Sequence, residues 1–120
     1  MKTVLMYNIG AQKGAKIKVI CHKMKLKCRA VSENELNLKL SELLESDVSP
    51  SAEALSLGGE MLYLSGLSDI ELRIFLAQLR AAKTPVALKA IATETNLGFT
   101  SRELYAEILA EHEAMRNNQA

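Results

Sequence analysis

The chain has 120 residues, of which 48% are hydrophobic and 24% charged, and its formal net charge is +1. This length suits one domain with a real core, and the composition excludes a disordered or membrane-embedded class. Because the sequence has no Trp, three Tyr and two Phe, an aromatic platform for stacking nucleic-acid bases is not expected.

The charges are unevenly distributed along the chain. Eight of the fifteen Lys and Arg residues lie in residues 1–32, which contain no acidic residue, whereas residues 33–120 carry the other seven and all fourteen Asp and Glu. The two parts therefore stand at +8 and −7. This asymmetry favours an acidic partner or a homo-oligomer joined through charge-complementary edges.

The amino-terminal segment predicts a strand, a helix and a second strand. The run Val4–Tyr7 is continuously apolar, as in a strand covered on both faces. A helix is expected over residues 12–25 and a short strand over 27–31. The apolar run at the amino terminus is too short for a membrane span or a signal peptide, so we expect a cytoplasmic protein. Because the cytosol is reducing, we expect its two cysteines to be free thiols. The helical stripe consists of Ile17, Ile20, Cys21 and Met24.

Three capping boxes predict the starts of the remaining helices. In each, a Ser or Thr precedes a Glu by three residues, and an apolar stripe follows. The pairs are Ser32 with Glu35, Ser68 with Glu71, and Thr100 with Glu103. The stripes are Leu36, Leu40, Leu43 and Leu44; Leu72, Phe75, Leu76 and Leu79; and Leu104, Ile108 and Met115, the last in a helix over 101–116.

The alternation of strands and helices predicts the fold class. Further strands are expected at Met61–Leu64 and Val86–Ile91, with a flexible connection at about 45–59. We expect a single three-layer α/β domain over residues 1–120. Its four-stranded, mostly parallel sheet has the order 2-1-3-4, with four helices on its faces.

A parallel sheet would place one polar rim at the carboxyl ends of the strands, where ligands bind in such folds. The stretch 93–96 is the richest in polar atoms, although Thr and Asn there also suit a turn that caps the next helix. The candidate ligand-binding residues are Asn8, Gly10, Ser65, Gly66, Thr93, Glu94, Thr95 and Asn96, with Ser32 on the same rim.

The loop after the first strand resembles a phosphate-binding loop only in part. Gly10 and Gly14 are separated by three residues, and Lys16 does not directly follow the second glycine, so the P-loop pattern fails. Anion binding at the helix amino terminus, with Lys13 or Lys16, stays open. Cys21 and His22 point in different directions on their helix, so one metal ion cannot easily reach both. The sequence also shows no cofactor motif and no catalytic constellation.

The basic first helix predicts a solvated surface. Lys16 and Lys23 flank its apolar stripe on one side, and Lys18 and Lys25 on the other. This pattern is thin for a specific nucleic-acid reader and permits weak phosphate attraction at low salt.

From Glu60 onward, the chain resembles an uncharacterised bacterial family, the domain of unknown function 3783. The resemblance implies a small, stand-alone cytosolic protein and brings no activity, cofactor or catalytic residue. The residues that carry it are Glu60, Met61 and Leu62; Gly66, Leu67 and Ser68; Leu88, Lys89 and Ala90; Thr93 and Asn96; Glu111 to Met115; and, near the amino terminus, Leu5, Tyr7 and Asn8. Phe99 stands where that family often has Trp.

Three functions are consistent with these patterns. The first is a non-enzymatic binding or regulatory module that uses the polar rim for a small ligand or protein. The second is a hydrolase or transferase for a phosphorylated small molecule, with the Gly10–Lys16 loop holding the anion and Glu94 acting as base. The third is weak nucleic-acid binding through the basic helix.

Overall fold

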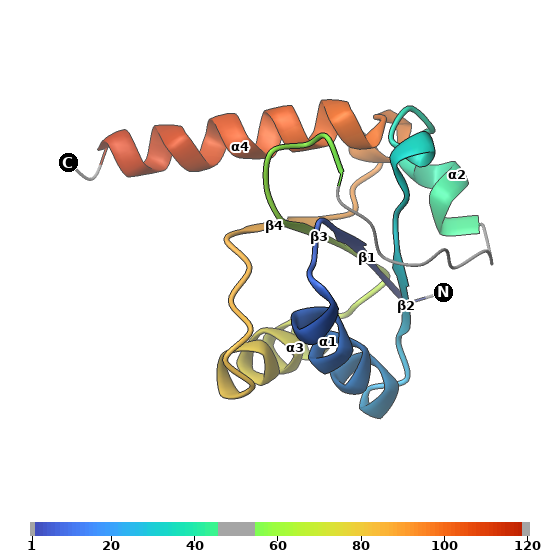
Figure 1. The fold of residues 1–120 in the computed structure, drawn as a ribbon, viewed down its shortest axis with the longest axis vertical. Helices are drawn as coiled ribbons and strands as arrows, with labels where there is room; N and C mark the ends of the chain where they lie inside the picture. Colours follow the sequence, from blue (N-terminus) through green and yellow to red (C-terminus); the bar gives the residue numbers. More distant parts are fainter. Residues whose placement is uncertain (1, 46–54, 119–120) are drawn as a thin grey trace.

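The computed structural model describes residues 2–45 and 55–118. The expected flexible connection therefore lies partly outside the described residues. The chain alternates strands and helices, as the sequence predicts (Figure 1). In order, the elements are β1 (Thr3–Tyr7), α1 (Ala11–Lys23), β2 (Lys27–Ala30), the 3-10 turn η1 (Glu33–Glu35), α2 (Leu40–Glu45), β3 (Met61–Ser65), α3 (Asp69–Ala81), β4 (Leu88–Ile91), the 3-10 turn η2 (Asn96–Gly98) and α4 (Ser101–Asn118).

The sheet has the predicted order β2-β1-β3-β4 and is mixed. β1 pairs with β2 and β3 with β4 in parallel, but the central pair, β1 with β3, is antiparallel. Tyr7 at the end of β1 lies opposite Met61 at the start of β3. The chain thus enters β3 at the edge where β1 ends, so the expectation of one rim carrying all four carboxyl ends is wrong.

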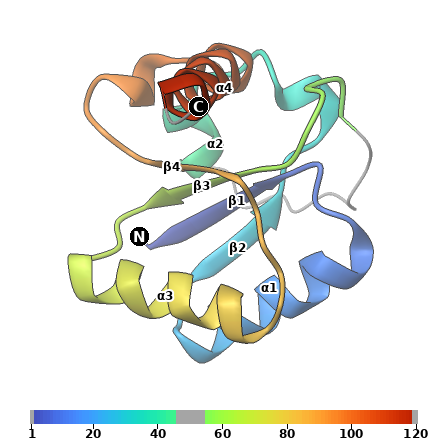
Figure 2. The same cartoon turned by 90° about the vertical axis from the view of Figure 1, so that its left-hand side faces the viewer.

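Each face of the sheet is covered by two helices, which gives the expected three layers (Figure 2). Helices α1 and α3 cover one face, and α2 and α4 the other. A hydrophobic core lies on each face of the sheet. The core between the sheet and helices α1 and α3 is centred on Val4, Met6, Ile17, Leu62, Leu64 and Phe75. The core between the sheet and helices α2 and α4 is centred on Leu5, Tyr7, Leu36, Leu40, Tyr63 and Leu104. The strands β1 and β3 are buried on both faces, which is why their sequences read as continuous apolar runs.

The two halves of the described chain repeat one arrangement about a pseudo-twofold axis. β3 and α3 each begin 58 residues after β1 and α1 and have the same lengths, five and thirteen residues. Leu5 pairs with Tyr63, its own counterpart, so the axis passes through this pair. Left-handed backbone recurs at equivalent positions, Asn8 with Gly66 and Lys25 with Lys83. The domain is therefore two βαβ units joined through their first strands.

The three predicted capping boxes are all formed. Ser32 with Glu35 and Ser68 with Glu71 make the reciprocal bonds at η1 and α3. At α4, the Thr100 N–H donates to Glu103 and the Glu103 N–H donates to the Thr100 hydroxyl. These local signals placed the helices correctly, although the segment after Ser32 forms the 3-10 turn η1 and the short helix α2 instead of one helix.

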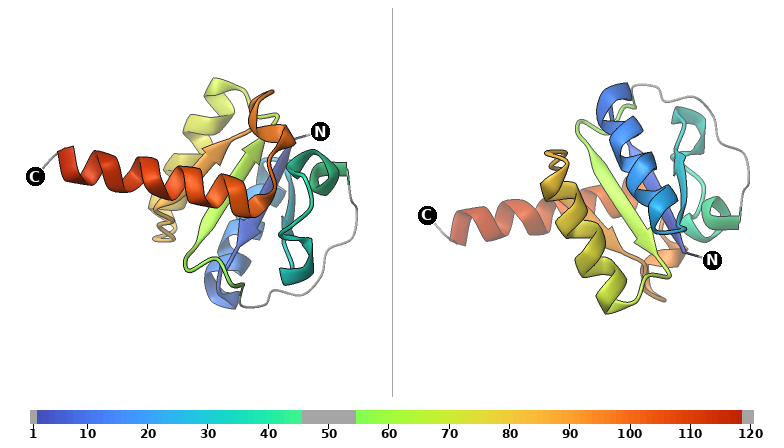
Figure 3. Two further views of the ribbon diagram at one scale, coloured as in Figure 1. Left: turned by 90° about the horizontal axis from the view of Figure 1, so that it is seen from above. Right: turned by 90° about the horizontal axis from the view of Figure 1, so that it is seen from below.

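Helix α4 extends past the β4 edge of the sheet (Figures 1 and 3). Leu104 is buried and Ile108 partly buried, as the stripe predicts. Met115 is 63% exposed, so its predicted burial is wrong. No sheet lies beneath the helix at that point, so the Met115 side chain has no surface of the sheet to pack against although it continues the apolar stripe. In the parts of the chain that the structure describes, no helix is long and apolar enough to cross a membrane.

Helix α3 offers a direct test of the core between the helices and the sheet. Phe75 is fully buried, whereas its neighbour Ile74 is 45% exposed. We expect Phe75→Ala to lower the free energy of unfolding by about 3–5 kcal/mol, because it removes buried apolar area and leaves a cavity. Ile74→Ala is the matched control and should cost about 1 kcal/mol or less. Urea denaturation measures both, and equal losses would contradict this packing.

Candidate functional site

The predicted rim residues divide between opposite edges of the sheet. Asn8, Gly10 and Ser32 follow β1 and β2 at one edge, whereas Ser65, Gly66 and the stretch 93–96 follow or end β3 and β4 at the other. The two groups are separated by the length of the strands. One ligand bound at a single rim therefore cannot contact both groups.

The Asn8 side chain is used within the fold. Its amide oxygen accepts from the Leu55 N–H, and its amide nitrogen donates to the carbonyls of Leu55 and Gly59 at 3.2 and 3.1 Å. These bonds hold residues 55–59 against the sheet, where Leu55 and Leu57 are buried. Asn8 adopts a φ of 58°, a left-handed conformation that Asn tolerates better than most residues. Its role in this structure is to place the chain for β3.

Asn96 has the corresponding role at the other edge. Its amide oxygen accepts from the Tyr63 hydroxyl at 2.7 Å and from the Thr93 N–H at 2.9 Å, and its amide nitrogen donates to the Ile91 carbonyl at 3.0 Å. The amide thus links β3, the end of β4 and η2. Thr93, Glu94 and Thr95 are exposed on the turn that Asn96 holds. The turn-forming interpretation of this stretch accounts for Asn96 and Thr93.

The loop after β1 does not share a site with Glu94. The loop starts where β1 ends, and Glu94 lies just after the end of β4. Because β1 and β4 run in opposite directions, these two ends lie on opposite sides of the sheet. The proposed pairing of an anion loop with a Glu94 base is therefore wrong on geometry. Gly10 is the N-cap of helix α1, so the helix has no side-chain cap, and its first turn contains no acidic residue. A hollow of about 190 Å³ lies beside it, lined by Met6, Ile9, Gly10, Ala11, Gly14, Ala15, Lys18 and Ala30.

Part of the amino-terminal positive charge is neutralised within the domain. Lys2 pairs with Glu71 at 2.5 Å, and Lys13 pairs with Glu60 at 2.9 Å. Arg29 is buried at 1% exposure and makes a bidentate pair with Glu35. The predicted basic surface is exposed, and it consists of Lys16, Lys18, Lys23 and Lys25 on α1 and just after it.

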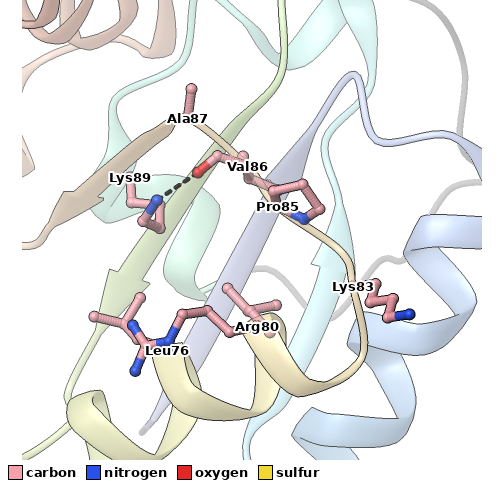
Figure 4. Close-up of a pocket in the computed structure, with 8 residues that line it drawn as sticks. Leu76, Arg80, Lys83, Pro85, Val86, Ala87 and Lys89 are labelled. Carbon is pink, nitrogen blue, oxygen red and sulfur yellow. Dashed lines mark hydrogen bonds between the residues drawn. The ribbon is translucent and has the colours of Figure 1, made fainter.

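A groove lies between α3 and β4 (Figure 4). It measures about 620 Å³, within the usual size of small-molecule sites. Its lining is mostly apolar, with three cationic side chains. In Figure 4, Lys83 points toward α1, whereas Arg80 and Lys89 extend to the opposite side. The lining residues are Leu76, Leu79, Arg80, Lys83, Pro85, Val86, Ala87 and Lys89.

The groove arises where the second βαβ unit departs from the first. β4 begins 61 residues after β2, although β3 and α3 begin only 58 residues after their counterparts. Three extra residues therefore lengthen the connection between α3 and β4, and this connection contributes Pro85, Val86 and Ala87 to the lining. The Lys13 ammonium fixes its path by donating to the Pro85 carbonyl at 2.9 Å.

Sequence reasoning missed this groove. Leu76 and Leu79 read as ordinary core positions, and Arg80, Lys83 and Lys89 as surface charges. The available signal was the length of the segment between the third helix and the fourth strand, with Pro85 inside it. That signal has meaning only when the two units are aligned on their structures.

Other polar clusters in the described residues serve the core. The Tyr7 hydroxyl lies 2.7 Å from the Ser101 hydroxyl, and burial raises the pKa of Tyr7 well above its usual value. Burial also raises the pKa of Tyr63 to about 12. Both phenols stay neutral at physiological pH and act as hydrogen-bonding groups. No cluster of His, Cys, Asp and Glu suited to a metal ion occurs within residues 2–45 and 55–118.

The roles of Asn96 and Glu94 can be separated by substitution. Asn96→Ala removes three bonds and leaves the Tyr63 hydroxyl without its acceptor, so we expect the free energy of unfolding to fall by about 1–3 kcal/mol. Glu94→Ala, on the same exposed turn, should change it by less than about 0.5 kcal/mol. Thermal and urea melts measure both. A stable Asn96→Ala variant would show that the amide is not structural.

Comparisons with known proteins identify a family for the second half of the chain. No curated protein and no solved structure matches the chain. Residues 60–115 match the family model described as Domain of unknown function (DUF3783). The match runs from the start of β3 into α4 and includes the α3–β4 groove; the resemblance at Leu5, Tyr7 and Asn8 lies outside it. Over residues 60–115, the chain is therefore similar to this domain of unknown function, DUF3783.

Proposed function

We propose that this protein is a non-enzymatic binding module whose α3–β4 groove holds an anionic amphiphile, a small molecule with an apolar body and a carboxylate or phosphate group. The observation that supports this proposal is the groove itself, with its apolar lining and cationic side chains. This location replaces the strand-end rim, whose residues divide between two edges.

The lining offers separate partners for the two parts of such a ligand. Leu76, Leu79 and Val86 present apolar surface, and covering it removes area from water. Arg80 and Lys89 lie beside this surface (Figure 4). A guanidinium presents a planar fork that matches the oxygens of a carboxylate or phosphate.

The lining set favours binding over catalysis. It contains no Asp, Glu, His, Cys, Ser, Thr or Tyr, so the only ionisable groups among its lining residues are two lysine amines and one guanidinium. Lys89 donates to the Val86 carbonyl, and Lys13 holds the Pro85 carbonyl and the Glu60 carboxylate. These bonds fix the walls of the groove before a ligand enters, which reduces the ordering cost of binding.

A thermal-shift experiment with three probes tests the proposal. Octanoate, octyl phosphate and octanol have the same apolar chain, and only the first two carry an anion at neutral pH. Ligands that bind the native state raise the Tm by mass action. We expect the two anions to raise the Tm in a concentration-dependent way and octanol to have a much smaller effect. Equal shifts for all three, or no shift, would overturn the proposal.

A pair of variants then locates the binding. Arg80→Gln removes the charge and keeps a shorter polar side chain, so the Kd for octanoate should rise about tenfold, equivalent to about 1.4 kcal/mol. Lys23→Gln removes an exposed charge at the end of α1, outside the groove, and is the matched control. Isothermal calorimetry measures both. A loss of affinity that is the same in the two variants would indicate general charge attraction instead of a site.

A further inference from the structure

The end of α4 and the α3–β4 groove lie at the same edge of the sheet but on opposite faces. Figure 1 shows α4 and the connection between α3 and β4 extending on the same side of the molecule, beyond β4. Helix α4 crosses one face of the sheet, and the groove lies on the other, beside α3 (Figure 2). β4 is the last strand, and its outer edge pairs with no strand in the described residues. An open strand edge is a common place for a second chain to associate.

The part of α4 that extends past the sheet is amphipathic and weakly acidic. Glu111 and Met115 continue the stripe of Ile108 on one helical face, and both are exposed, Met115 at 63%. Glu113, two residues after Glu111, lies on the opposite side of the helix. Residues 109–116 carry two Glu and one Arg, a net charge of −1 with His neutral, and the negative end of the helix dipole adds to it. This helix end therefore presents a carboxylate and an apolar side chain together.

The groove offers the complementary surface. Its lining combines apolar side chains with the cations Arg80 and Lys89 and contains no acidic residue. Leu88 and Ala90 belong to the core on the α4 side of the sheet, so the alternate residues of β4, Lys89 and Ile91, point to the groove side. Ile91 is 51% exposed. Apolar surface therefore continues from the groove along the open edge of β4.

A twofold axis that lies in the plane of the sheet, parallel to β4, brings these two surfaces together. Such an axis places a second copy beside β4 with its faces exchanged, so the α4 of that copy extends on the side where the first copy has its groove. The stripe that each α4 end turns toward the plane of its own sheet then faces the groove of the other copy. Both contacts form at once, so the pair closes as a dimer and does not continue into a filament.

We propose that two copies of this chain form a twofold dimer in which the end of each α4 docks in the α3–β4 groove of the other copy. Met115 then packs on the apolar lining, and Glu111 pairs with Arg80 of the partner subunit. The docked helix and a ligand compete for one groove, so dimerisation closes the groove and ligand binding releases monomers. This competition rests on the proposed function, whereas dimer formation is testable without a ligand.

Sedimentation equilibrium of the full chain over a concentration series tests the dimer. We expect a reversible equilibrium between monomer and dimer. Glu111→Arg should raise the dissociation constant of the dimer by at least about tenfold, because it places a cation against the cationic groove. Glu113→Arg makes the same change of net charge on the other side of the helix and is the matched control, with no change expected. A protein that stays monomeric throughout, or equal effects of the two variants, would overturn the proposal.

A charge exchange locates the contact in the groove. Arg80→Glu should weaken the dimer as Glu111→Arg does, because it places two carboxylates together. The double variant, Arg80→Glu with Glu111→Arg, restores opposite charges and should recover much of the lost affinity between the copies. Circular dichroism and a cooperative melt confirm that each variant is folded. A double variant that dimerises no better than the single variants would show that α4 does not dock beside Arg80.

Octanoate separates this inference from the proposed function. Added octanoate should shift the wild type toward monomer, and Glu111→Arg should bind octanoate at least as tightly as the wild type, because no helix competes for the groove. If octanoate binds and the dimer persists unchanged, the helix does not occupy the groove and this inference fails. If octanoate does not bind although the charge exchange restores the dimer, the proposed function fails and the docking of α4 stands.

Discussion

The antiparallel pairing of β1 with β3 determines most of this structure. Leu5 and Tyr63 face each other across it, and both are fully buried. Because the two central strands run in opposite directions, the carboxyl ends of β1 and β2 lie at one edge and those of β3 and β4 at the other. The same pairing relates two βαβ units by a pseudo-twofold axis and places α1 and α3 on one face. Polar residues that follow β1 and β2 therefore lie at the opposite side of the sheet from those that follow β3 and β4.

The sequence predicted the elements better than their directions, for a physical reason. Capping boxes and helical stripes are local, and those at Ser32, Ser68 and Thr100 each mark a real helical start. A strand buried on both faces has no alternation that reveals its direction, because its apolar run is equally compatible with parallel and antiparallel neighbours. The deciding contacts are long-range: the Asn8 amide bonds to Leu55 and Gly59, which lead the chain into β3. Such pairing of distant segments leaves no periodic signal.

The internal repeat explains how the groove between α3 and β4 arises. The first unit passes from α1 to β2 through a short turn with Lys25 in the left-handed conformation. The second has the equivalent residue, Lys83, and then a longer path through Pro85 to β4. An added loop in one of two similar units opens space at one site and leaves the shared sheet unchanged.

The extension of α4 beyond the sheet follows from dimensions. Ser101 lies above β1, where its hydroxyl bonds to Tyr7, and β4 is two strands away, about 10 Å at the usual strand spacing. Met115 is fourteen residues further along the helix, about 21 Å at 1.5 Å per residue. A helix that crosses the strands must therefore leave the sheet well before Met115. The apolar stripe predicts correctly which face of α4 turns toward the sheet. Burial of that face also requires a sheet wide enough to cover it, and the width of the sheet depends on its number of strands rather than on the helix.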